Sequence, residues 1–410
     1  MSRYLSLVFV LLAGSMLAKD ITVKRSRSYL RQGPASYYEV LMEIPTNSKV
    51  KVIKEGMEWL QVEYRKQRGY LSRTSTQAQK KPGDPFTNLQ RPPMSANAQG
   101  VTAGVKGFCA KFNTDLKVSS SFPDLALSTG VNPRDYQEFY KQTFNKRKPS
   151  HFLKAYSLPE RKFVDFYSEA AEGFGLSVAS IIAAQGLYKN APLATYVNKL
   201  GTVVASAADT PEIQYRFFLL DISQPNAYAC PGGFIFISKG MLQLVENEAQ
   251  LAFVLAHEIA HVSRFHGLKE IKLMENQIAA EDVFAEMEKD LADRSSQKFA
   301  DLSKDLESDI REMAATLTEG RLDTYEEEAD AVALLLLARS GYNPKAGEEL
   351  LTKLLNTRYE SNNQHYRRQS VQERLKLIKT KTARLKNSRL HFISDHPRFT
   401  THKAFLDSRQ

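Results

Sequence analysis

Residues 251–261 constrain the fold of this chain more than any other segment. The first six, 251–256, are apolar nearly all round and contain neither Gly nor Pro, which predicts a buried helix. The same helix then continues into the pattern His-Glu-x-x-His at 257–261. A buried helix must satisfy such polar side chains with specific partners, because burying an unpaired polar group is costly. The fold therefore has to bring partners to this one helix.

The two histidines of this pattern predict a metal site. Residues four apart share one face of a helix, so His257 and His261 can both reach one Zn²⁺ at about 2.0–2.1 Å. Glu258 is offset from the pair and can take a proton from a metal-bound water without binding the metal. The alternative, two histidines and a glutamate on a surface helix, is disfavoured by the apolar run. We therefore expect a catalytic zinc site, which needs a third protein ligand.

A later acidic helix is expected to supply that ligand. Residues 325–331 read Tyr-Glu-Glu-Glu-Ala-Asp-Ala and open a second helix. Glu326 and Asp330 are four residues apart and share a face. Glu326 can therefore bind the zinc, while Asp330 accepts the N–H of a zinc-bound histidine and fixes its tautomer. An acidic first turn that suits the helix dipole is the alternative explanation for some of these carboxylates.

Three neighbouring ionisable residues are expected to stay out of the site. His266 follows His261 by five residues, which turns it away on a continuous helix, so we interpret it as a helix-end residue and not a ligand. Glu327 and Glu328 point away from the face of Glu326 and are expected in solvent.

Four motifs along the chain resemble those of a known family. Besides 257–261 and 326–330, they are PNAYACPGGFIFISKGML at 225–242 and Ser-Asp-His-Pro at 394–397. Together they resemble the gluzincin metallopeptidases of family forty-eight, the HtpX, CAAX-prenyl-protease and BepA group, over about residues 105–407. The resemblance implies an α+β, mainly α-helical zincin-like metallopeptidase domain with a small β-sheet. It also implies hydrolysis of peptide bonds with one Zn²⁺ per chain.

The late motif supplies one more candidate. The resemblance places it near the metal, so His396 is a candidate donor to the oxyanion that forms during hydrolysis. His396 can instead occupy the open metal position in a resting form, or be a loop residue that caps structure. Two positions depart from the family pattern: Tyr325 stands where Arg is common, and His402 stands where Arg is usual.

Two strands are expected ahead of the metal-binding helix, at 215–221 and 233–238. The second is expected at the edge of the sheet beside the cleft, where an extended polypeptide substrate adds by main-chain hydrogen bonds. The residues of this expected substrate edge strand are Gly233, Phe234, Ile235, Phe236 and Ile237.

The first 18 residues have the plan of a secretory signal peptide. Arg3 supplies a basic start, residues 5–13 are apolar, and small residues follow. The apolar stretch is shorter than the roughly 18–20 residues of a membrane-spanning helix. We therefore expect an exported protein of the bacterial periplasm or cell envelope, with no integral membrane span once the signal peptide is removed. Cleavage after Ser15 and after Ala18 both fit the sequence, and an uncleaved N-terminal anchor or a buried helix is the alternative.

Residues 20–75 predict a small all-β barrel, because short alternating runs are separated by turn signals. The runs at 29–34 and 69–72, with Trp59, resemble a bacterial SH3-type domain. This segment holds eleven Lys or Arg against six Asp or Glu. A docking module for peptidoglycan or envelope proteins is one interpretation, and a solvated basic surface on a folding spacer is the other.

Residues 76–104 lack apolar periodicity and are interpreted as a flexible linker, followed by the metallopeptidase domain at 105–410. Within this domain, 268–320 is expected to be a helical insertion, either a lid or partner-binding arm or a packed helical pair. Residues 367–389 carry nine Lys or Arg against one Glu and are interpreted as a solvated helix face or a surface for anionic lipid or polymer. The apolar stripe of the insertion consists of Phe299, Leu302, Leu306, Ile310, Met313 and Leu317.

These features favour an exported zinc endopeptidase that acts on unfolded or misassembled envelope proteins. The net charge of +10 over 410 residues is mild and does not demand nucleic acid as a partner. The alternatives are a latent or non-proteolytic chaperone or scaffold, which would not need Glu258, and a cell-wall-binding protein that works through the SH3-like domain.

Overall fold

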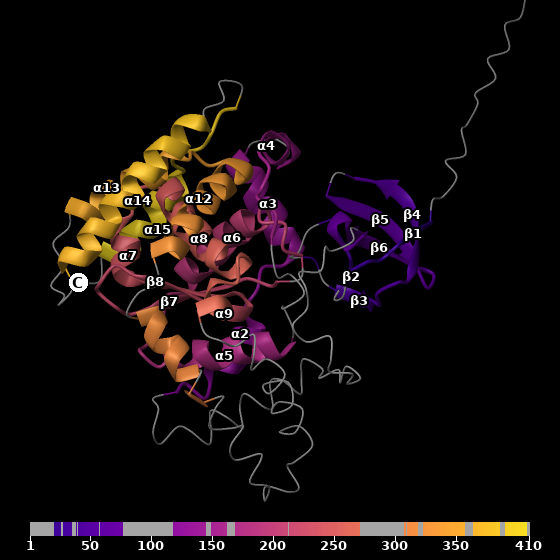
Figure 1. Cartoon of the computed structure of the whole chain (residues 1–410), viewed down its shortest axis with the longest axis horizontal. Coiled ribbons are helices and arrows are strands. Elements are labelled where there is room, and N and C mark those ends of the chain that lie inside the picture. Colours follow the sequence, from indigo (N-terminus) through magenta and orange to yellow (C-terminus); the bar gives the residue numbers. More distant parts are fainter. Residues whose placement is uncertain are drawn as a thin grey trace, which may run out of the picture. The chain divides into compact units, whose positions relative to one another are not determined.

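The chain separates into two compact units, one formed by residues 1–34 and 39–79 and the other by residues 35–38 and 80–410 (Figure 1). The predicted signal peptide at 1–18 and nearly all of the predicted linker lie outside the described residues, and their boundaries stay predictions. The computed structural model describes residues 20–25, 28–34, 38, 40–56, 58–76, 118–144, 149–161, 169–211, 213–270, 307–308, 310–318, 323–356, 364–385 and 390–407.

The smaller unit is all-β, as its alternating sequence predicts. In β4, Val50 and Val52 are buried while Lys49 and Lys51 are exposed, because successive side chains of a strand face opposite sides. All pairings are antiparallel, in the order β1-β4-β5-β6-β2-β3. Its elements are β1 (Asp20–Thr22), β2 (Ser28–Arg31), β3 (Val40–Ile44), β4 (Lys49–Glu55), β5 (Trp59–Tyr64), β6 (Gln67–Ser72) and the short helix η1 (Arg73–Thr76).

The larger unit is built around one small sheet and many helices. The sheet contains β7 (Arg216–Leu220), β8 (Ala227–Cys230) and β9 (Phe234–Ser238), with the turn η3 (Pro231–Gly233) between the last two. The helices are α2 (Phe122–Ser128), α3 (Pro133–Phe144), α4 (Pro149–Ala155), α5 (Glu169–Ala183), α6 (Ala191–Ala205), α7 (Lys239–Leu244), α8 (Glu248–Ser263), α9 (His266–Glu270), α12 (Asp323–Ser340), α13 (Lys345–Asn356), α14 (Gln364–Arg384) and α15 (Pro397–Asp407). Among the described residues, none of the helices combines the length and apolar character needed to cross a bilayer.

The prediction that residues 233–237 form the edge strand of the sheet is wrong. The observed order is β7-β9-β8, so β9 lies in the centre, parallel to β7 and antiparallel to β8. Gly232 and Gly233 have φ angles of 80° and 91°, which glycine adopts readily, and the resulting turn brings β8 and β9 together as neighbours. All five residues of β9 are buried. Its unbroken apolar run is typical of a strand covered on both faces, not of an edge.

Helix α8 is the buried helix that the apolar run predicts. Every one of its residues is buried. The Asn247 side chain caps its first turn by accepting a hydrogen bond from Gln250 N at 2.9 Å. The helix packs against α6, α12 and β8. It ends after Ser263, and Phe265 then adopts a left-handed φ of 58°, which reverses the chain before α9.

The described end of the predicted insertion is helical. Residues 310–318 form helix, and Ile310, Met313 and Leu317 of the predicted stripe are buried in the core of the larger unit. This segment therefore behaves as a packed amphipathic helix. Residues 271–306, with the other three positions of the stripe, lie outside the described residues.

A buried ionic cluster fixes the first turn of α8. Glu248 is fully buried and accepts two hydrogen bonds of 2.7 Å from Arg398 at the start of α15. The hydroxyls of Tyr196 and Tyr342 each donate to the same carboxylate at 2.8 Å. The Arg398 guanidinium also lies 3.6 Å from the ring centroid of Phe139. Three helices and the segment between α12 and α13 are thus joined through one carboxylate.

Removing Arg398 should therefore be far more damaging than removing a surface cation nearby. Arg398→Met leaves Glu248 buried without its counter-charge and should lower the free energy of unfolding by about 3–5 kcal/mol. The matched control is Lys353→Met, which breaks the exposed Lys353–Glu246 pair of 2.6 Å and should cost about 0–1 kcal/mol. Chemical denaturation measures both, and equal losses would contradict the assignment.

Candidate metal centre

Helices α8 and α12 bring three predicted metal ligands together. The Nε2 atoms of His257 and His261 lie 3.0 Å apart. Glu326, on α12, places Oε2 at 3.2 Å from Nε2 of His257 and Oε1 at 3.2 Å from Nε2 of His261. Among the described residues, these three form the group whose donor atoms could hold one metal ion.

The donor set fits a tetrahedral metal ion. Donors held at 2.0–2.1 Å around such an ion stand about 3.3 Å apart, close to the separations of 3.0 to 3.2 Å found here. Two imidazoles and one carboxylate leave a fourth position open. Glu258 lies on the same turn of α8 and is only 7% exposed.

Asp330 and Arg374 form the layer behind this group. Asp330 is fully buried, and its Oδ1 lies 3.0 Å from Nδ1 of His257, at ion-pair distance. Arg374, on α14, donates to both Asp330 oxygens at 2.7 and 2.9 Å and lies 2.9 Å from Oε2 of Glu326. One guanidinium therefore holds the carboxylates of Glu326 and Asp330 in place, as its planar fork allows.

The electrostatics of the metal-free site follow from this arrangement. Burial lowers the pKa of His257, but the Glu326 and Asp330 carboxylates outweigh it and raise that pKa to about 10. Burial raises the pKa of Glu326 and of Asp330, but the Arg374 guanidinium and His257 hold both pKa values below their usual range, and His261 adds to this effect at Glu326. The site is thus prepared for a cation.

His266 and Glu328 lie closer to the site than the sequence suggested. His266 is not among the three donors, but its Nδ1 lies 2.9 Å from Nδ1 of His261. Its Nε2 lies 3.2 Å from Glu328, so Glu328 is not simply solvated. The expectation that His266 turns away assumed a continuous helix, whereas α8 ends at Ser263 and the chain reverses.

His396 has a structural role in the described contacts. It precedes α15, and its Nδ1 accepts a hydrogen bond from Arg398 N at 3.3 Å, as a capping residue does. The preceding Ser394 and Asp395 are tied to the first turn of α8. That turn lies about 13 Å along the helix from His257. The capping alternative is therefore favoured, and a catalytic role for His396 stays a prediction.

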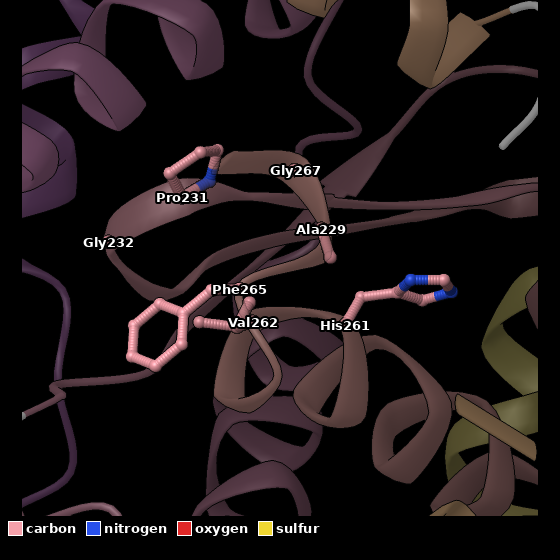
Figure 2. A pocket seen from close by; sticks show the side chains of 7 residues that line it. All are labelled: Ala229, Pro231, Gly232, His261, Val262, Phe265 and Gly267. Carbon is pink, nitrogen blue, oxygen red and sulfur yellow. The ribbon is translucent and has the colours of Figure 1, made fainter. Parts of the chain in front are cut away.

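A small pocket lies beside His261, between the end of β8 and the end of α8 (Figure 2). Its lining is apolar apart from the histidine, and in Figure 2 the rings of His261 and Phe265 point in opposite directions. The outer strands of the described sheet are β7 and β8, and β8 is the outer strand that packs against α8, the helix with the two candidate histidine ligands. The lining consists of Ala229, Pro231, Gly232, His261, Val262, Phe265 and Gly267.

Sequence reasoning missed Arg374, although the pattern of α14 contains its signal. Val371, Leu375 and Ile378 pack on the core, and Arg374 shares their helical face. An arginine on an apolar stripe indicates a buried anion, because an unpaired buried charge is costly. The basic segment is therefore not a uniformly solvated face: Arg374 points inward, while Lys376 and Lys379 are exposed.

Comparisons with known proteins agree with this geometry. Residues 192–405 match the family model of peptidase family M48, and residues 26–76 match that of a bacterial SH3 domain. The predicted resemblances to metallopeptidase family forty-eight and to an SH3-type domain are confirmed by these matches.

Several curated proteins are similar to part of the chain. The beta-barrel assembly-enhancing protease of Escherichia coli K12 is 34% identical over 175 residues, 42% of this chain and 35% of that protein. Its counterpart in Yersinia pestis is 31% identical over 166 residues, 40% of this chain and 33% of that protein. The mitochondrial metalloendopeptidase OMA1 of Schizosaccharomyces pombe is 26% identical over 191 residues, 47% of this chain and 52% of that protein. The chain thus matches about a third to a half of the length of these relatives.

Arg374 should be needed for the stability of the metal-free site. Arg374→Leu leaves only the protonated His257 imidazole to balance the buried Glu326 and Asp330 carboxylates, so the metal-free protein should lose about 3–5 kcal/mol of unfolding free energy. Excess metal should restore part of the loss, since it supplies positive charge at the same place. Denaturation with and without metal measures this, and Lys376→Leu on the exposed face is the control. No difference between the two variants would contradict the assignment.

Metal binding should release a proton from His257. Its pKa of about 10 means that the metal-free imidazole is protonated at pH 8, whereas a metal ligand must be neutral. Affinity for Zn²⁺ should therefore rise about tenfold per pH unit between pH 7 and 9. Calorimetry at pH 8 in buffers of different ionisation enthalpy counts the released protons. A binding heat that is independent of the buffer would contradict this expectation.

Proposed function

Because this chain belongs to peptidase family M48, we propose that it is a zinc-dependent endopeptidase. The observation that carries the proposal is the convergence of His257, His261 and Glu326, with Glu258 on the same helical turn. Two imidazoles and one carboxylate with an open fourth position are the donor set of catalytic zinc in several peptidases.

Each residue has a distinct part in the proposed reaction. When bound, zinc polarises the scissile carbonyl and lowers the pKa of a water molecule to about 7. Glu258 takes up the proton of the attacking water on its carboxylate and delivers it to the leaving amine nitrogen. Asp330 and Arg374 hold His257 and Glu326 in position, which keeps the donors converged. The contacts of His396 favour capping of α15, and His396→Ala tests the predicted role as a second donor to the carbonyl oxygen, which requires slower cleavage at unchanged zinc content.

The substrates we propose are unfolded or misassembled proteins of the bacterial envelope. Support comes from the relatives named beta-barrel assembly-enhancing protease and from the signal-peptide plan of residues 1–18. An exported location in the periplasm or cell envelope is part of this proposal.

A docking role for the SH3-like unit is the second part of the proposal. Its strand β4 exposes Lys49, Lys51 and Lys54 on one stretch of chain, which suits an anionic polymer such as peptidoglycan or an acidic envelope protein. Retention of the full chain on purified peptidoglycan, with those three lysines changed to Gln as the comparison, tests this role.

The endopeptidase is tested by Glu258→Gln. Cleavage of unfolded casein should fall by about 10²–10⁴-fold, because general acid–base catalysis is lost, while one zinc per chain is retained. Glu327→Gln is the control, since Glu327 is an exposed neighbour of Glu326. Zinc binding without cleavage in the unaltered chain would favour the latent or chaperone alternative. A chain that binds no zinc would refute the proposal.

A further inference from the structure

His266 occupies a defined place behind the second candidate metal ligand. It is fully buried at the start of α9. One of its ring nitrogens, Nδ1, lies 2.9 Å from Nδ1 of His261, and the other, Nε2, lies 3.2 Å from a carboxylate oxygen of Glu328. Nothing in the proposed reaction uses this chain of contacts.

Two features of the local fold hold the His266 ring in this orientation. The left-handed φ of Phe265 breaks the helical course after α8, and His266 thereby comes into contact with His261. The Tyr325 ring then stacks on the His266 ring, with centroids 4.7 Å apart and an angle of 19° between the planes. Tyr325 immediately precedes the candidate ligand Glu326, so the stack lies directly against the metal centre.

The geometry determines where the protons of the two rings lie when a metal is bound. His261 directs Nε2 at the other donors, so its proton must be on Nδ1. Two facing ring nitrogens form a hydrogen bond only if one of them has a proton and the other does not. Nδ1 of His266 must therefore accept, which places the His266 proton on Nε2, where it is donated to Glu328.

We propose that His266 is a positioning residue that accepts the Nδ1–H of His261 and donates its own Nε2–H to Glu328. This relay fixes the tautomer and the ring orientation of the second metal ligand. Hydrogen-bond partners of this kind raise the basicity of the ligand histidine and the affinity of the site for the metal. The inference rests on metal binding at the proposed centre, but not on peptide hydrolysis.

The relay differs from the arrangement behind the first ligand. His257 is supported by the carboxylate of Asp330, which is fully buried and clamped by Arg374. His261 is supported by an imidazole, whose carboxylate partner Glu328 has a side chain that is 43% exposed. The two histidines of one metal site therefore depend on different partners, which can be removed separately.

Two substitutions at position 266 separate positioning from packing. His266→Phe keeps a ring that can stack on Tyr325 but removes the acceptor, so Zn²⁺ affinity should fall about 10–100-fold. His266→Asn places an amide oxygen where Nδ1 stood and should retain most of the affinity, although it loses the ring. Competition with a chromophoric chelator measures Zn²⁺ affinity on the full chain. A merely structural role predicts the opposite order, because Asn disturbs the packing more than Phe.

A second pair of variants acts at the outer end of the relay. Glu328→Ala should weaken Zn²⁺ binding, whereas Glu327→Ala should leave it unchanged. Both side chains are exposed, so the comparison remains available if His266→Phe does not fold. Thermal unfolding of the metal-free variants checks that the folds are equally stable.

The outcomes are distinct. Two results together support the relay. His266→Phe binds Zn²⁺ more weakly than His266→Asn, and Glu328→Ala loses Zn²⁺ affinity while Glu327→Ala does not. Wild-type affinity in His266→Phe, or equal affinities in the two Glu variants, overturns it. Zinc binding in an unaltered chain that cleaves nothing favours the latent or chaperone alternative over the active peptidase but leaves the relay intact.

Discussion

The contact between α8 and α12 is the interaction on which the larger unit depends. Helix α8 is buried along its whole length, yet it carries His257, Glu258 and His261. Ionisable groups persist in such a place only when charged partners or a metal compensate their lost hydration. Helix α12 supplies that compensation through Glu326 and Asp330, and α14 adds Arg374. The packing of the core and the candidate metal centre are therefore one arrangement, not a site placed on a finished fold.

The same principle operates at the other end of α8. Glu248 in its first turn is buried and is compensated by Arg398 and two tyrosine hydroxyls. The two ionic clusters lie on one helix, about 13 Å apart. Each cluster includes a helix from the C-terminal part of the sequence. Helix α14 contributes Arg374 at the candidate metal ligands, and α15 contributes Arg398 at the first turn of α8. Buried charges of this kind specify which segments pack together, since a wrong partner would leave a charge unpaired.

The relation between sequence and structure differs from one motif to the next. The helix at 251–261 and the shared face of Glu326 and Asp330 follow from local periodicity, which the sequence displays directly. The position of β9 does not. Its residues were recognised as a strand, but strand order depends on the turn at Pro231–Gly233 and on long-range pairing. The contact of Arg374 with Glu326 and Asp330 was also not predicted. Helical spacing shows that a residue faces the core, but it does not show which residues it contacts there.

The sequence by itself determined the family, the all-β and mainly α-helical parts, and the three residues that the structure brings together as donors. These depend on motifs and on periodicity within single strands and helices, which the covalent chain fixes. Tertiary structure alone decided that His266 returns to His261, that Arg374 clamps both carboxylates, and that β9 lies in the centre of its sheet. Each depends on a chain reversal or on packing between distant segments. Local periodicity contains no information about the direction in which the chain continues after a helix or strand ends.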